Sequence, residues 1–109
     1  LVTLNDVQFV EAARNLAQRV MTTDAEFATR VNTLFRLCAS RLAADAEIAI
    51  CREVFDAQLA VFKADAEAAK KHVSLGESPR NETLDAAEHA AWTVLSTMIL
   101  NMDEVLTRG

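Results

Sequence analysis

The chain has 109 residues, which is enough for one domain with a single packed core and too few for two ordinary domains. It is 51% hydrophobic but contains only two glycines and one proline, and this scarcity of turn residues excludes a disordered polymer and favours helix over sheet. Its 11 basic and 16 acidic side chains give a net charge of −5, which opposes binding to nucleic acid phosphates, so nucleic acid is not expected among its partners.

Two shorter helices are expected in the first half of the chain. The first spans residues 6–22 and follows Asn5, a good N-cap residue, with apolar side chains recurring at helical intervals. The second starts at a capping pattern formed by Thr23 and Glu26 and reaches about residue 41. Because the connection between them is very short, the two helices must be antiparallel neighbours or a sharply angled pair.

Two longer helices are expected in the second half. Asp45 can cap a third helix of about 28 residues, or roughly 40 Å at 1.5 Å per residue, whose apolar positions step by threes and fours to Val73. A loop follows over residues 74–83. Asp85 with Glu88 then marks the start of a fourth helix that continues almost to the last residue. The sequence therefore predicts an all-α fold: a small antiparallel bundle of four helices, two shorter and then two long.

The chain has no apparent targeting or membrane segment. No apolar run approaches the roughly 20 residues that a membrane-spanning helix requires, so membrane insertion is not expected. The first residue is Leu1 rather than Met, and no signal-peptide pattern precedes the first helix. We therefore expect residues 1–109 to form a single helical domain that is a fragment of a larger protein, with the upstream domains of the same polypeptide as its partners.

The two cysteines allow two interpretations. Twelve residues separate Cys38 from Cys51, and this spacing matches neither a paired-cysteine redox motif nor a haem-attachment motif. The simplest interpretation is that both are small hydrophobic residues buried on helix faces. The alternative is a structural disulfide across the turn between the second and third helices, which would require an oxidising compartment.

No complete catalytic, cofactor-binding or metal-binding constellation is present. His72 and His89 have no partner at a recognised metal-ligand spacing, and His89 is most simply a surface residue bonded to Asp85. Asp103 and Glu104 are adjacent on a helix, so their side chains diverge by about 100° and do not form a carboxylate pair. The sequence therefore predicts no catalytic residue, no cofactor and no metal ligand in this chain.

Asn101 is the most unusual residue of the last helix, because it interrupts an otherwise apolar run. Its place beside that run predicts burial, and a buried amide needs hydrogen-bond partners. The first interpretation is a buried polar tie from Asn101 to the start of the first helix, near Asn5 and Asp6. The alternative is that Asn101 and Asp103 complete a site whose other wall belongs to another part of a longer protein.

Four separated blocks of sequence carry a family resemblance. They are residues 4–6 with 8–14, residues 35–38 with Arg41, residues 76–78, and residues 90–93 with 100–104. In this order they resemble the last part of a planctomycete-specific domain of unknown function, although Val7 stands where that family often has proline. The resemblance implies the C-terminal end of a large exported protein, periplasmic or extracellular, which often has a cytochrome c-like domain upstream. The haem motif belongs to that upstream domain, so no haem ligand is carried over.

These observations lead to one functional expectation and two alternatives. The expectation is a non-enzymatic helical structural and interaction module at the C-terminus of a large exported multidomain protein. The first alternative is part of a composite active site in an exported polysaccharide-acting or redox protein, with Asn101, Asp103 or Asp6 lining a shared cleft. The second is a helical dimerisation module that forms a homodimer. An exported location would also favour the disulfide between Cys38 and Cys51.

Overall fold

The computed structural model describes residues 6–23, 26–74 and 83–108, with side chains over 10–23, 26–74 and 83–101. This part of the chain contains helices and no strand, which confirms the predicted all-α class. Its five helices are α1 (Asp6–Met21), α2 (Phe27–Ala39), α3 (Asp45–Ala64), α4 (Ala66–His72) and α5 (Ala86–Arg108). None of these described helices is both long and apolar enough to cross a lipid bilayer.

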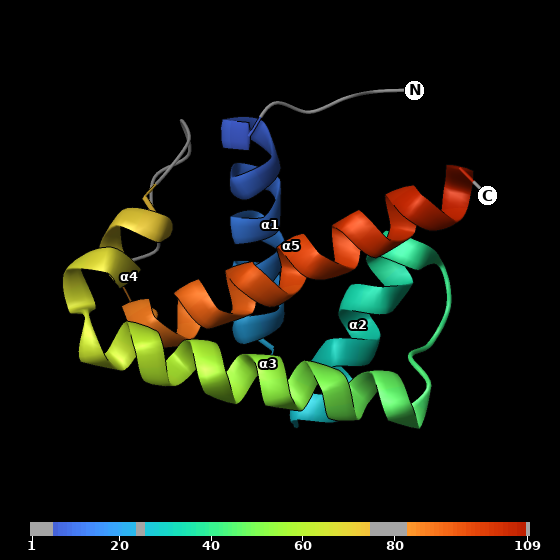
Figure 1. The fold of residues 1–109 in the computed structure, drawn as a ribbon, viewed down its shortest axis with the longest axis horizontal. Coiled ribbons are helices and arrows are strands. Elements are labelled where there is room, and N and C mark those ends of the chain that lie inside the picture. The colour runs from blue at the N-terminus through green and yellow to red at the C-terminus, as the bar shows by residue number, and fades with distance from the viewer. Residues whose placement is uncertain (1–5, 24–25, 75–82, 109) are drawn as a thin grey trace.

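The other helices are arranged around α5, which contacts α1, α2, α3 and α4 (Figure 1). Figure 1 shows that α1 and α2 run in opposite directions, as their short connection predicts, and that α1 crosses the direction of α5 steeply. By contrast, α3 runs beside α5 and antiparallel to it. The described helices therefore form two crossing antiparallel pairs extended by α4, rather than four helices aligned side by side.

An aromatic cluster joins α2, α3 and α5 at the centre of the main core. The Trp92 ring lies 5.2 Å from the Phe27 ring and 4.9 Å from the Phe55 ring, measured between centroids, and Trp92 is only 2% exposed. Two arginines lie over rings of this cluster. The Arg30 guanidinium carbon is 5.9 Å from the centroid of the Trp92 ring, and that of Arg52 is 4.8 Å from the centroid of the Phe27 ring. The packed rings and the arginines over them therefore hold α2, α3 and α5 together at one point.

The predicted continuous third helix is wrong, because the chain bends at Asp65. This residue leaves the helical conformation, with φ −133° and ψ 84°, and its Oδ1 accepts a hydrogen bond from the Ala68 backbone N–H at 3.1 Å. Asp65 is thus the N-cap of a new helix, α4. The bend turns α4 back toward α5 and forms a second apolar cluster, whose buried members are Phe62, Ala69, Val73, Ala87 and Ala90.

The predicted helix starts have mixed outcomes. The start of α5 is confirmed, because the Asp85 carboxylate accepts a hydrogen bond from the Glu88 backbone N–H at 3.0 Å. The expected cap of α2 is wrong: the Thr23 hydroxyl donates instead to the Arg19 carbonyl oxygen at 3.2 Å, at the end of α1. The N-cap of α2 is the extended residue Glu26, which makes no side-chain capping hydrogen bond.

Replacing Asp65 with Ala should destabilise the fold. The substitution leaves the Ala68 backbone N–H without its capping acceptor, and loss of such a cap costs roughly 0.5–2 kcal/mol. Urea unfolding followed by circular dichroism measures the change. Glu67→Ala is the control, because Glu67 is an exposed acidic residue in the same turn. Equal free energies of unfolding for the two variants would contradict the capping role of Asp65.

Candidate functional site

A buried arginine connects α1 to the end of α4. Arg14 is 1% exposed, and its Nη1 donates a hydrogen bond to the Val73 carbonyl oxygen at 2.9 Å. The carboxylate of Glu11, one turn earlier on α1, lies 3.6 Å from the Arg14 Nη2. Since a buried cation is stable only when it is hydrogen-bonded and paired, these contacts make burial of the guanidinium tolerable.

A buried histidine connects the same turn of α1 to α5. His89 has no exposed surface, and its Nε2 lies 3.1 Å from the Arg14 carbonyl oxygen. A carbonyl oxygen only accepts hydrogen bonds, so Nε2 must carry the proton. The expected surface bond between His89 and Asp85 is therefore wrong, because His89 faces the interior while the Asp85 carboxylate caps α5. Arg14 and His89 together tie α1 to α5 and to the end of α4.

The predicted burial of Asn101 is wrong, because the structure places this side chain at the surface of α5. Its position one step off the apolar face turns it outward. Of the predicted partners, Asn5 lies outside the described residues, and Asp6 begins α1 with its side chain outside the described part. The side chain of Asp103 lies outside the described part as well. The buried polar tie that the structure does describe is formed by Arg14 and His89.

Asn101 lies at the rim of an open groove between α1, α4 and α5. The groove has a volume of about 420 Å³, and its lining residues are Val10, His72, Val94, Thr97, Met98 and Asn101. The His72 ring packs against the Phe62 ring at 5.6 Å, and burial lowers the pKa of His72, which favours its neutral form. The Thr97 hydroxyl already donates to the Thr93 carbonyl oxygen at 2.9 Å. This groove offers hydrogen bonding in a mainly apolar setting.

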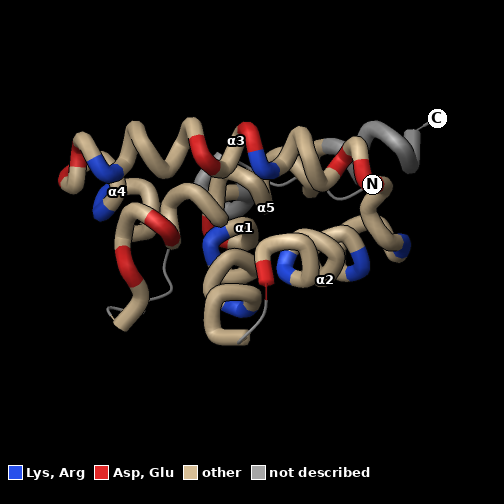
Figure 2. Tube along the Cα trace, turned by 90° about the horizontal axis from the view of Figure 1, so that it is seen from below, with Lys and Arg blue, Asp and Glu red and all other residues tan. Residues whose placement is uncertain are grey.

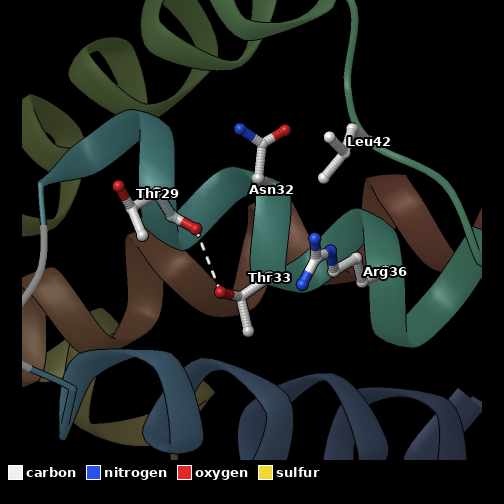
Figure 3. A pocket seen from close by; sticks show the side chains of 5 residues that line it. All are labelled: Thr29, Asn32, Thr33, Arg36 and Leu42. Atoms are coloured by element: carbon white, nitrogen blue, oxygen red, sulfur yellow. Dashed lines mark hydrogen bonds between the residues drawn. The ribbon is translucent and has the colours of Figure 1, made fainter.

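A second open groove lies along α2 and is more polar. It has a volume of about 240 Å³, and its lining residues are Thr29, Asn32, Thr33, Arg36 and Leu42 (Figure 3). The Asn32 Oδ1 accepts a hydrogen bond from the Ala43 backbone N–H at 2.9 Å, which fixes the loop that carries Leu42. Leu42 is 54% exposed, and Leu37 on α2 is 43% exposed. We call the groove formed by these five lining residues the α2 groove.

An ion pair closes the loop beside the α2 groove. Both guanidinium Nη atoms of Arg41 bond the carboxylate oxygens of Glu47 at 2.7 Å, and the same carboxylate accepts from the Ala44 backbone N–H at 2.8 Å. Ala44, not the predicted Asp45, is therefore the N-cap residue of α3. The hydrogen bonds from Arg41 and Ala44 lower the pKa of Glu47 to about 2. Leu42 is thus presented on a loop that is fixed at both ends.

The two cysteines belong to one apolar core. Cys51 on α3 is 1% exposed, and Cys38 on α2 is half-buried against the same cluster. The structure contains both as thiols, and burial raises the pKa of Cys51, which opposes formation of a reactive thiolate. The disulfide between them stays a prediction for an oxidising compartment. Within the described residues, no group of three or more His, Cys, Asp or Glu side chains is placed to hold a metal ion.

Sequence reasoning missed the roles of Arg14 and His89, although one signal was available. Arg14 lies on the apolar face of α1, between Ala13 and Ala17, where a charged side chain is buried if the helix is packed. Its partners are 59 and 75 positions away in the chain. No local pattern identifies such distant partners.

The fold and these ties define a class: a small all-helical module organised around one central helix. The sequence model of PSD1, described as a protein of unknown function (DUF1553), matches residues 1–55, which is half of the chain. The chain therefore belongs to the PSD1 family. The match covers α1, α2 and the first half of α3. Comparisons with curated proteins and with solved structures gave no match.

Replacing His89 with Phe should destabilise the fold by roughly 0.5–1.5 kcal/mol, because it removes the hydrogen bond from Nε2 to the Arg14 carbonyl oxygen that ties α5 to α1. His89→Gln retains a donor and should lose less. Urea unfolding of the purified chain measures both. His72→Phe is the matched control, since it changes a half-buried histidine to the same residue. An equal loss in both Phe variants would show that the hydrogen bond of His89 does not hold the helices together.

Acid should weaken the Arg41–Glu47 pair in a defined pH range. The pKa of Glu47 is about 2 in the folded chain against an ordinary 4.5, so the pair stabilises the fold fully above pH 4.5 and is lost as the pH falls toward 2. Thermal unfolding between these pH values should show a steeper loss of stability for the native chain than for Glu47→Gln. Parallel pH profiles for the two chains would contradict this assignment.

Proposed function

We propose that the chain is a non-enzymatic helical module that packs against other domains of a longer, exported polypeptide. The observation that supports this proposal is the α2 groove, where Arg36 lines the same groove as exposed Leu42, on a loop held by the Arg41–Glu47 pair. Exposed apolar side chains next to an arginine are typical of protein interfaces. The exported location is supported by the resemblance of the sequence to the C-terminal domains of exported proteins.

The buried polar groups support an architectural role. Arg14 and His89 join three segments of the chain. On α5, the buried hydroxyls of Thr93 and Ser96 donate to backbone carbonyl oxygens one turn earlier, at 2.7 and 2.9 Å. These polar groups are hydrogen-bonded inside the core. Arg14 and His89 position the helices relative to one another, while the two hydroxyls are satisfied within α5.

The chemistry of the α2 groove indicates the kind of segment that would occupy it. Thr29 and Thr33 line the groove with hydroxyl groups, Arg36 provides a cation, and Leu42 provides an apolar side chain (Figure 3). A segment with a carboxylate beside an apolar side chain complements this lining, because a carboxylate pairs with a guanidinium through two hydrogen bonds. We assign such a segment to a neighbouring domain of the longer polypeptide.

A second candidate function is a composite active site. It is favoured by one observation: exposed Asn101 shares a groove of about 420 Å³ with His72 and Thr97. A neutral imidazole and an amide could serve as hydrogen-bonding groups on one wall of a cleft. The reacting groups would then come from another domain, in a polysaccharide-acting or redox protein.

Hydrogen exchange in the longer polypeptide should distinguish these functions. Amide groups of residues 29–42 should exchange more slowly there than in the isolated chain, because a docked segment shields the α2 groove. Arg36→Glu combined with Leu42→Asp should abolish that protection, while Thr22→Asp, at another exposed turn, should leave it intact. Protection confined to the groove of His72 and Asn101 would favour the composite site instead. Identical exchange on α2 in both contexts would exclude the proposed docking.

A further inference from the structure

The side of α3 that faces away from the core is apolar over most of its length. Its exposed apolar residues recur at intervals of three and four in two groups separated by Glu53: Ala46, Ala49 and Ile50, then Ala57, Ala60, Val61 and Ala64. At about 100° per residue they lie opposite Cys51, Phe55 and Phe62, which face the core. Ile50 is 54% exposed and Val61 is 56% exposed. We call these seven residues the outer face of α3.

A row of charges borders the outer face of α3, and its pattern has a symmetry. The row consists of the exposed residues Asp45, Arg52, Asp56 and Lys63, whose signs alternate along the helix. Figure 2 shows the acidic and basic positions along α3, which include Glu47 and Glu53 in addition to the four residues of this row. Asp45 and Lys63 lie nine positions on either side of residue 54, and Arg52 and Asp56 lie two positions on either side. If a second α3 is laid antiparallel to the first about residue 54, every charge of the row therefore faces a charge of opposite sign.

We propose that the outer face of α3 binds the same face of a second copy of this chain, antiparallel, about a two-fold axis near residue 54. In this register Asp45 meets Lys63 of the second copy. Arg52 likewise meets Asp56 of the second copy, and each of these pairs occurs twice because the interface is isologous. In a parallel two-fold arrangement the rows of the two copies would lie on opposite sides of the contact and would not pair. The charge row thus complements itself in one orientation only.

The large apolar residues lie close to each other in this register, although they are not directly opposite. About an axis at residue 54, Ile50 lies opposite residue 58 of the other copy, which is less than one helical turn from Val61 of that copy. The alanines between them allow the helix axes to approach to about the lower end of the usual 8–10 Å separation. The contact from Ala46 to Ala64 extends about 27 Å along each helix at 1.5 Å per residue. An antiparallel helix pair of this length is a continuous interface.

Neighbouring contacts hold Arg52 in place for this pairing, and one residue opposes it. The Arg52 Nε lies 3.3 Å from the Asp56 carboxylate in the same helix, and its guanidinium lies over the Phe27 ring. Because these contacts already restrict the Arg52 side chain, it loses less conformational entropy when the dimer forms. Glu53 lies in the middle of the outer face, so association brings two carboxylates toward the two-fold axis. The dimer is consequently a weak one that Glu53→Ala should tighten.

The proposed dimer is independent of the docking assigned to the α2 groove. The two surfaces share no residue, since the groove is lined from α2 and its following loop. A neighbouring domain on α2 and a second copy on α3 can be bound at once. Failure of one proposal therefore leaves the other untouched.

Sedimentation equilibrium of the purified chain tests the dimer. The native chain should self-associate with a dissociation constant below about 1 mM. Lys63→Asp turns two attractive contacts into repulsive ones and should weaken the dimer by roughly tenfold, given the usual strength of exposed pairs. Adding Asp45→Lys restores opposite charges across the interface and should return the affinity to within about twofold of the native value.

Control variants separate this contact from general charge effects. Lys71→Asp makes the same charge change on α4, away from the outer face of α3, and should leave the affinity unchanged. Ile50→Glu should abolish the dimer while circular dichroism shows an intact helical fold, because Ile50 is exposed in the single chain. A monomeric native chain, or a double variant no tighter than Lys63→Asp, overturns the proposal and leaves this face to another partner.

Discussion

Two hydrogen bonds at one turn of α1 constrain the whole arrangement. Through its guanidinium, Arg14 holds the carbonyl of Val73 at the end of α4, and through its own carbonyl it holds His89 on α5. Burying a guanidinium costs free energy unless its N–H groups donate hydrogen bonds. The end of α4 must therefore lie where Arg14 can donate to the Val73 carbonyl oxygen. That requirement accounts for the bend at Asp65, because a straight continuation of α3 would carry Val73 away from α1.

The bend in turn determines which surfaces are covered. With α4 turned back, Phe62 at the end of α3 packs against residues of α4 and α5, while Phe55 packs against Trp92. One side of α3 therefore packs against the core along its entire length. The opposite side has no partner within the described part of the chain. The apolar outer face of α3 is a consequence of how the core is closed.

Local patterns predict the elements of this chain better than their arrangement. Helix α1 was expected over residues 6–22, and Asp85 was expected to open α5, because capping residues and apolar periodicity are properties of short segments. The break at Asp65 escaped prediction because apolar spacing of threes and fours continues on both sides of it. The outward position of Asn101 and the burial of His89 depend on helix phase and on partners far away in the sequence. Only folding brings those partners together.

The two exposed surfaces differ in symmetry, and symmetry decides what kind of partner each can take. The α2 groove has Arg36 at one point and Leu42 at another, with no relation that exchanges them, so it fits a different segment rather than a copy of itself. When one α3 is placed antiparallel to another, each charge of the row faces a charge of opposite sign. Such self-complementarity is what an isologous contact requires. Together, the two proposals describe a chain that attaches to its own polypeptide through α2 and brings two such polypeptides together through α3.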